Sequence, residues 1–197
     1  MPRKPQRNTR GKIVSAAWKL FYEQGYEHTT VEDILALSGT SKGTFYHYFE
    51  GKDALLGTLS VLFDEKYEAL LPTLPEDMDA LDTLAWLNRE LFAMIDNSIP
   101  LDLLARLLST QLTVRGEKRL LDRDRVYFRL LREIVSRGQA RGEVRTDMSV
   151  NEITKAYALM ERALMYDWCL CSGVYNLSRY GAEMMGQFLE SYRAREK

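Results

Sequence analysis

The residues best suited to binding chemistry lie together at positions 41–47, in the run Ser-Lys-Gly-Thr-Phe-Tyr-His. A lysine can bind a phosphate or a guanine edge, and a glycine lets the backbone approach a sugar-phosphate chain closely. Threonine, tyrosine and histidine side chains can also reach phosphates or base edges. An ordinary helical corner explains the apolar residues here but not this polar set, so the run indicates contact with a nucleic acid.

The residues around this run predict two short helices joined by a tight turn. Thr30 and Asp33 fit the capping pattern in which a hydroxyl and a carboxylate satisfy the free amides of a helix start. Gly39 suits a helix end where the backbone turns left-handed, and Ser41 can cap the second helix. The inward side of that helix would come from Phe45, Tyr48 and Phe49. The pattern predicts a helix-turn-helix whose second helix enters the DNA major groove.

The N-terminal segment adds a local positive charge. Residues 1–12 contain five basic residues and no acid. Residues 1–49 contain seven Lys or Arg and four Asp or Glu, a net charge of +3, while the whole chain carries −1, so residues 50–197 carry −4. A basic arm on a slightly acidic body predicts a local footprint for a polyanion.

Residues 9–56 resemble the TetR (tetracycline-repressor-like) family of bacterial transcriptional regulators. The resemblance is carried by GYEHTTVEDI and SGTSKGTFYHYFEGKDALL, which follow an apolar first-helix stripe of Ile13, Ala16, Ala17, Leu20 and Phe21. At the level of motifs it covers about the first quarter of the chain. It implies an all-α fold in which residues 1–52 form a three-helix helix-turn-helix DNA-binding domain. Residues 53–197 would form a helical effector-binding and dimerisation domain.

The resemblance also implies a function, that of a DNA-binding transcriptional regulator. The most specific form is a ligand-responsive homodimeric repressor of a palindromic operator in double-stranded DNA. An activator or a partner-controlled regulator of the same fold is an alternative, as is an all-helical interaction module without a DNA target. The residues expected to contact DNA are Arg7, Thr9, Arg10, Thr29, Thr30, Ser41, Lys42, Gly43, Thr44, Tyr46, His47 and Lys52.

Breakers divide the rest of the chain into further helices. Proline at positions 72, 75 and 100 and glycine at 142 interrupt the apolar periodicity, and Ser149 with Glu152 forms a capping box. The expected helices cover residues 55–71, 77–95, 101–113, 119–141, 149–172 and 177–193.

Large, soft or aromatic side chains in these helices are candidates for the pocket of a small-molecule effector. Glu161 lies in an otherwise apolar run, where a buried acid could meet a cationic effector. Pairing with a neighbour such as Arg162, or exposure to solvent, would also satisfy this acid. The sequence leaves the effector's identity open. The candidate pocket residues are Phe63, Tyr67, Trp86, Tyr127, Met160, Met165 and Trp168.

The last two helices are the candidates for a dimer interface. The final helix is apolar over a wide arc, and a strip of Gly181, Ala182 and Gly186 permits close helix contact. Both helices could instead complete the core of the monomer. The family resemblance favours a homodimer in which two helices per subunit form a four-helix bundle. The expected interface residues are Tyr180, Met184, Phe188 and Tyr192.

Other function classes find no support in the sequence. The two histidines, His28 and His47, both lie in the DNA-binding stretch, and no glycine-rich fingerprint links a strand to a helix. We therefore expect no enzyme activity, no cofactor and no metal site. No apolar run is long enough to span a membrane, and the charged N-terminus lacks the features of a signal peptide. A cytoplasmic location is expected.

Overall fold

The computed structural model describes residues 7–74, 77–113 and 118–195, with the side chains of Arg7 and Asn8 left out. The chain divides into two compact units. The first comprises Met1–Val61 and Asp102–Arg115, and the second comprises Leu62–Leu101 and Gly116–Lys197. The expected all-α fold is confirmed: the described residues hold helices and turns, and one isolated antiparallel bridge joins Val144 to Arg193.

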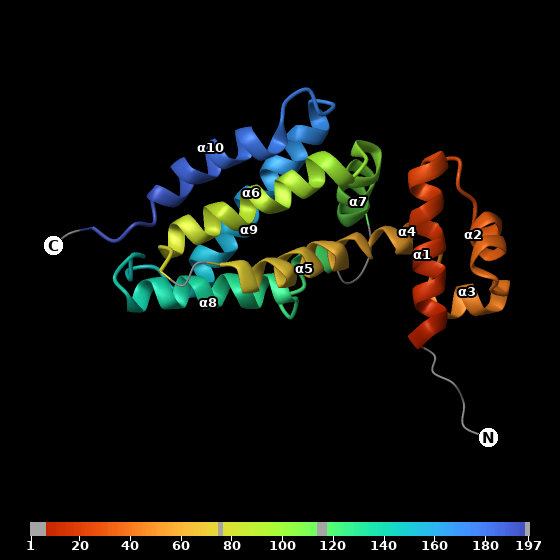
Figure 1. Ribbon diagram of the computed structural model, residues 1–197, viewed down its shortest axis with the longest axis horizontal. Helices are drawn as coiled ribbons and strands as arrows, with labels where there is room; N and C mark the ends of the chain where they lie inside the picture. Colours follow the sequence, from red (N-terminus) through yellow and green to blue (C-terminus); the bar gives the residue numbers. More distant parts are fainter. Residues whose placement is uncertain (1–6, 75–76, 114–117, 196–197) are drawn as a thin grey trace, which may run out of the picture. The chain divides into compact units, whose positions relative to one another are not determined.

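The first unit is built from the N-terminal helices, drawn from red to orange in Figure 1, and most of one later helix. Helix α1 packs against α2, and α2 contacts α3. The core is apolar and draws on every one of the short helices, with Ile13, Ala17, Phe21, Ile34, Phe45, Leu55 and Leu56 fully or almost fully buried. The helices are α1 (Arg7–Gln24), α2 (Val31–Ser38), α3 (Lys42–Tyr48), α4 (Lys52–Leu56) and α7 (Leu101–Thr113).

The predicted turn chemistry is present at both ends of α2. The Thr30 hydroxyl accepts from the Asp33 amide at 3.1 Å, and the Asp33 carboxylate accepts from the Thr30 amide at 2.9 Å. Gly39 ends the helix with a φ of 65°, which a residue with a side chain rarely adopts. Ser41 then caps α3 by accepting from the Thr44 amide at 3.2 Å. These local bonds set the turn between the two helices.

The helix expected over residues 55–71 is broken in two. Helix α4 ends at Leu56, and α5 (Leu59–Leu70) begins after a turn at Gly57 and Thr58. The Thr58 hydroxyl donates to the Leu55 carbonyl at 2.5 Å and accepts from the Trp18 indole nitrogen at 2.7 Å. A threonine that bonds its own backbone in this way competes with the helix, which explains the break.

The second unit consists of α5, from Leu62 onward, and the later helices other than α7. Helix α10 packs along α6 in the most extensive helix pair of the molecule, and both are seen side by side in Figure 1. Helices α8 and α9 complete the unit through contacts of α8 with α6 and of α9 with α8 and α10. The elements are η1 (Leu71–Thr73), α6 (Ala80–Ser98), η2 (Arg119–Leu121), α8 (Val126–Ala140), α9 (Val150–Leu170) and α10 (Leu177–Glu190).

One other expected helix is also divided. The segment expected to be helical over residues 119–141 forms the short η2 and then α8. Between them the Asp122 carboxylate accepts from the Asp124 amide at 2.9 Å, a side-chain bond that favours a turn over a helix. By contrast, α7 covers residues 101–113 as expected.

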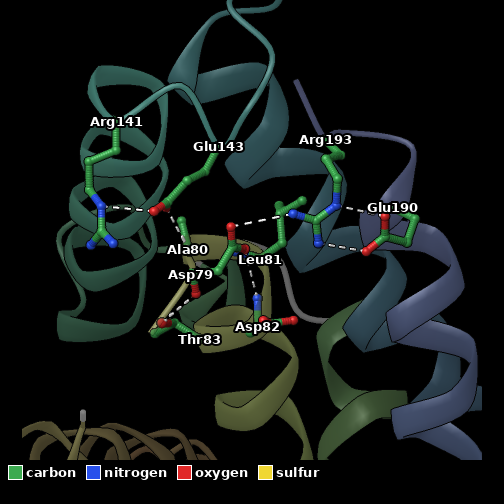
Figure 2. Close-up of polar contacts among 9 residues, drawn as sticks. All are labelled: Asp79, Ala80, Leu81, Asp82, Thr83, Arg141, Glu143, Glu190 and Arg193. Carbon is green, nitrogen blue, oxygen red and sulfur yellow. Dashed lines mark hydrogen bonds and ion pairs between the residues drawn. The ribbon is translucent and has the colours of Figure 1, made fainter. Parts of the chain in front are cut away.

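A polar cluster joins three distant segments at one end of α6, and Figure 2 shows its members. The Asp79 carboxylate caps α6 by accepting from the Leu81 amide at 2.8 Å and also pairs with Arg193 at 3.3 Å. The Glu143 carboxylate accepts from the Ala80 amide at 2.9 Å. This cluster fixes the start of α6 against the loop after α8 and the segment after α10.

Gly181 explains how α10 can lie so close to α6. A Cβ atom at this position would overlap the ring of Phe92 on α6. At Gly186, five residues further along α10, an added Cβ finds no atom within 4 Å. Gly181 therefore serves packing within the chain, in line with the alternative in which this helix completes the core of the monomer.

We predict that Gly181→Ala destabilises the protein by about 1–3 kcal/mol, since overpacking a filled contact forces side chains and backbone to shift. Gly186→Ala is the matched control and should be neutral or stabilising by up to about 1 kcal/mol, since alanine favours a helix. Chemical denaturation monitored by helical circular dichroism measures both. Equal effects of the two substitutions would refute the close-packing role of Gly181.

Candidate DNA-binding surface and effector cavity

The outer face of α3 carries the residues predicted to touch DNA. Lys42, Gly43 and His47 are exposed, and the Tyr46 side chain is 49% exposed. Thr44 is half-buried because its hydroxyl bonds that of Ser41 at 2.8 Å. The opposite face is fixed in the core by the buried rings of Phe45 and Phe49. Helix α3 thus presents a polar and aromatic surface from a rigid apolar anchor.

Glu32 is a neighbour of this surface that the sequence analysis did not identify. Its carboxylate lies 3.3 Å from the Lys42 ammonium, and both side chains are well exposed. An exposed pair of this kind contributes little stability, so Lys42 can exchange it for a phosphate at low cost. The angle between α2 and α3 brings positions 32 and 42 together. Because these residues lie on different helices, no spacing rule within one helix predicts their contact.

Two of the residues predicted to bind DNA have structural roles within the unit. Thr29 is buried, and its hydroxyl donates to the Gly25 carbonyl at 2.8 Å. The Lys52 ammonium donates to the carbonyls of Tyr26 and Thr29 at 2.7 and 2.8 Å. Both residues therefore hold the loop before α2, and contact with a phosphate remains a prediction for them.

The remaining predicted residues lie along the start of the unit. Thr30 and Ser41 are exposed helix caps, and Thr9 is half-buried. Arg10 is exposed, with its guanidinium 5.4 Å from the ring centre of Phe49. The side chain of Arg7 lies outside the described residues.

Tyr26 connects α7 to the loop before α2, inside the first unit. The guanidinium of Arg106 on α7 lies 5.2 Å from its ring centre and forms an ion pair with Glu27. The Tyr26 hydroxyl donates to Asp53, and burial, followed by this bond, raises the pKa of the phenol. The loop that leads into α2 is thus tied to α4 and to α7.

The second unit contains a small cavity of about 20 Å³. Four of the seven predicted pocket residues line it, namely Phe63, Tyr67, Tyr127 and Met165. Trp86, Met160 and Trp168 are not in its lining, and the Trp168 indole instead donates to the Tyr175 carbonyl at 2.8 Å. The space is enough for about one water molecule, so a larger ligand requires the walls to rearrange.

Glu161 is the polar centre of this cavity. Its side chain is almost fully buried, and its carboxylate accepts from the Tyr67 hydroxyl and from the Asn88 amide, each at 3.1 Å. Burial raises the pKa of the carboxyl, and the bonds from Asn88 and the tyrosines at positions 127, 67 and 157 oppose the rise only in part. Of the three states considered from the sequence, the structure supports the buried acid.

The cations near Glu161 do not neutralise it by an ion pair within the described residues. Arg125 lines the cavity but binds Asp64 through two nitrogens, at 2.9 and 3.0 Å. Arg162 also lines the cavity without an ion pair to a described residue. Glu161 is therefore a buried acid among hydroxyl and amide donors, a setting suited to a ligand with a positive charge or several donors.

The predicted dimer residues differ in exposure along α10. Tyr180 is 41% exposed, and Met184 and Phe188 are half-buried. Tyr192 is buried, with its ring centre 5.2 Å from that of Phe188, and its carbonyl accepts from the Arg145 amide at 2.8 Å. Large apolar side chains are also exposed at Leu159, Leu170 and Val174.

Comparison with known proteins gives a consistent picture. The family model described as bacterial regulatory proteins, tetR family, matches residues 13–59. The HTH-type transcriptional regulator CymR of Pseudomonas putida is 30% identical over 141 residues, which is 68% of this chain and 70% of CymR. The probable HTH-type transcriptional regulator ArpR of Pseudomonas putida is 34% identical over 94 residues, which is 48% of this chain and 44% of ArpR.

A similar solved structure is that of Thermus thermophilus FadR, a TetR family transcriptional repressor in complex with lauroyl-CoA. It has a TM-score of 0.74 and 23% sequence identity, and the match covers 95% of this chain and 97% of FadR. The chain spans between 24% and 44% of the length of four other curated relatives that it matches.

The exposed α3 follows α2 after a tight turn, which places the chain in the class of helix-turn-helix proteins. The chain also has a second helical unit. The chain belongs to the tetR family of bacterial regulatory proteins. Within the described residues, none of the helices is long and apolar enough to span a bilayer. The same residues contain no group of three or more His, Cys, Asp or Glu placed to hold a metal ion.

We predict that Glu161 makes stability depend on pH. Because its folded pKa is raised, the neutral acid favours folding below the unfolded value, and this contribution is lost as pH rises through the folded pKa. The melting temperature of Glu161→Gln minus that of wild type should therefore grow from about pH 4 toward pH 8. Glu133→Gln, at an exposed site on α8, is the control. A difference that does not change with pH would contradict the prediction.

Proposed function

We propose that the protein is a ligand-responsive, homodimeric transcriptional repressor that binds a palindromic operator through α2 and α3. The observation that carries the proposal is the exposed row of Lys42, Gly43, Tyr46 and His47 on a helix anchored by buried aromatic rings. A helix of this kind fits the major groove, where base edges carry a distinct pattern of donors and acceptors. Membership of a family of regulatory proteins supports it.

Phosphate contacts would position α3 on the duplex. The start of α2 at Thr30 and the start of α3 at Ser41 each present backbone amides, which attract anions. Arg10 and the basic residues before it in the sequence add positive charge at the same end of the chain. Thr9, Thr44 and Lys52 would contribute smaller contacts, since each is already partly buried or engaged within the unit.

Dimerisation would use the exposed apolar residues of α9 and α10. Leu159, Leu170 and Tyr180 lie on the outer surfaces of these helices, where a second copy could cover them. A two-fold axis through this contact would present two α3 helices to half-sites about 34–36 Å apart, or a multiple of that spacing.

An effector would act from the cavity around Glu161. The chain passes between the two units within α5 and again at the junction of α6 and α7. A ligand that enlarges the cavity would displace α5 or α6, and α7 carries Arg106, which contacts the loop before α2. The shift in DNA affinity can be no larger than the ligand's difference in affinity for the two states. FadR, which was solved with lauroyl-CoA, supports an organic effector in the helical body.

The other parts of the proposal follow from this role. The chain acts by binding and not by catalysis, and it acts in the cytoplasm, where the DNA is. An activator of the same fold would use the same surfaces, and an interaction module without a DNA target would not bind duplex DNA. Measuring the affinity for duplex DNA at several salt concentrations distinguishes a DNA-binding regulator from such a module, since phosphate contacts make the affinity fall steeply with salt.

We predict that Lys42→Ala and Tyr46→Ala each weaken operator binding by about 1–3 kcal/mol, while leaving the fold intact because both side chains are exposed. Glu32→Gln should instead strengthen binding, since it removes a negative charge and the intramolecular partner of Lys42. Fluorescence anisotropy with an operator selected from random duplexes measures all three.

The opposite signs at positions 32 and 42 make the test specific. A general loss of structure would weaken binding in every variant and lower the melting temperature with it. If the double variant at positions 42 and 46 binds its operator as tightly as wild type, α3 is not the recognition helix.

We predict that Tyr180→Glu converts the dimer to a monomer, because a charge would be buried in an apolar contact. Sedimentation velocity measures the mass, and operator affinity should fall with it because only one half-site is then held at a time. Leu112→Glu, at an exposed leucine of α7, is the matched control and should remain dimeric. A dimeric Tyr180→Glu variant would place the interface elsewhere.

A further inference from the structure

A second, larger pocket lies in the second unit, lined by residues of α8, of α9 and of the segment before α8. Its volume is about 350 Å³, within the usual range for sites that bind small molecules. It is distinct from the Glu161 cavity, although Arg162 lines both. None of the residues predicted from the sequence to bind an effector lines this pocket.

The charge of the lining is strongly positive. Arg123, Arg132, Lys155 and Arg162 all line the pocket, and none forms an ion pair with another residue that the structure describes. Glu152 is the acid in the lining, and its carboxylate is already bonded to the Ser149 amide and hydroxyl at 2.8 and 2.7 Å. Four cations around one pocket attract an anion much more strongly than separate surface charges do.

A buried hydroxyl in the lining lacks a partner. Thr154 on α9 is 3% exposed, and its side-chain oxygen bonds to no other described residue. Leaving a buried hydroxyl unsatisfied costs stability. A threonine in a helix usually bonds a carbonyl of the preceding turn. The Thr154 oxygen makes no such bond, so it keeps its capacity to bond a ligand that displaces the wall of the pocket.

Apart from Asn151, the rest of the lining is apolar. Phe128 on α8 and Ala158 on α9 are both buried, and they form a hydrophobic part of the wall beside the cations. The pocket therefore combines a cationic part, one hydroxyl and an apolar part. A free inorganic anion would use only the first two of these.

We propose that this pocket binds a small amphipathic organic anion, with its phosphate or carboxylate group among Arg123, Arg132 and Lys155 and its apolar part against Phe128 and Ala158. A second copy of the chain fits less well, because a two-fold contact would bring the same cations of both copies together. The inference goes beyond the proposed repressor function, since neither the binding nor its test requires DNA or the Glu161 cavity.

The test uses isothermal titration calorimetry on the full chain with octyl phosphate as the probe. Octyl phosphate should bind saturably, and inorganic phosphate and octyltrimethylammonium should each bind at least about tenfold more weakly. Arg132→Ala and Lys155→Ala should each weaken octyl phosphate binding by about tenfold. Arg137→Ala is the control, because this arginine is exposed on α8 outside the lining. Octanoate in place of octyl phosphate shows whether the head group is preferred as phosphate or carboxylate.

Thr154→Val separates a ligand contact from a structural role. Removing an unpartnered hydroxyl should raise the melting temperature, while the affinity for octyl phosphate falls. Equal binding of octyltrimethylammonium, unchanged affinity in Arg132→Ala and Lys155→Ala, or full affinity in Thr154→Val would each overturn the proposal. Loss of dimerisation in Lys155→Ala without loss of probe binding would assign the surface to a second copy and overturn it as well.

Discussion

The close approach of α10 to α6 is the contact on which the second unit depends. Gly181 permits it, because any side chain there would meet Phe92. Carboxylates hold both ends of the pair: Asp96 accepts from the first amides of α10, at Leu177 and Ser178, and Asp79 binds Arg193 beyond its last turn. With α6 held in this way, Asn88 reaches Glu161 and the Leu84 carbonyl accepts from Tyr157. The cavity around Glu161 thus follows from the packing of a different helix pair.

The first unit depends on shorter-range forces. Helices α2, α3 and α4 are too short to be stable alone, so caps and buried aromatic rings must hold them. Thr30, Gly39 and Ser41 fix the direction of the chain, while Phe45 anchors α3 from beneath. Lys52 then ties the loop before α2 through two carbonyls. As a result, the fold depends little on the outer residues of α3, which are exposed and can bind DNA.

The sequence predicts what short-range patterns determine. The capping box at Thr30 and Asp33 needs a spacing of three residues, and the exposed face of α3 needs only the helical period, so both could be recognised. The breaks at Thr58 and Asp122 could not, since they arise from side-chain bonds that compete with helix propensity.

Contacts between distant segments could not be predicted either. Glu161 accepts hydrogen bonds from Tyr67 and Asn88, which lie far away in the sequence. Because only the fold brings these residues together, the sequence could not decide whether this acid is buried. The same reason explains why four of the predicted pocket residues line the Glu161 cavity and three do not. Trp168 has the size and softness of a pocket residue. Its indole instead donates to the Tyr175 carbonyl, just before α10, and the residue type alone does not predict that contact.

Unsatisfied polar groups link the energetics of the second unit to its proposed sites. Within the described residues, the buried side-chain oxygens without a hydrogen-bond partner are those of Asn88 and Thr154. Asn88 donates to Glu161 through its amide nitrogen, and Thr154 lines the larger pocket of the second unit. A buried group of this kind costs about 1–3 kcal/mol, and a replacement by an apolar residue of similar shape would remove that cost. Their presence is consistent with the general tendency of proteins to break local packing rules where a ligand binds.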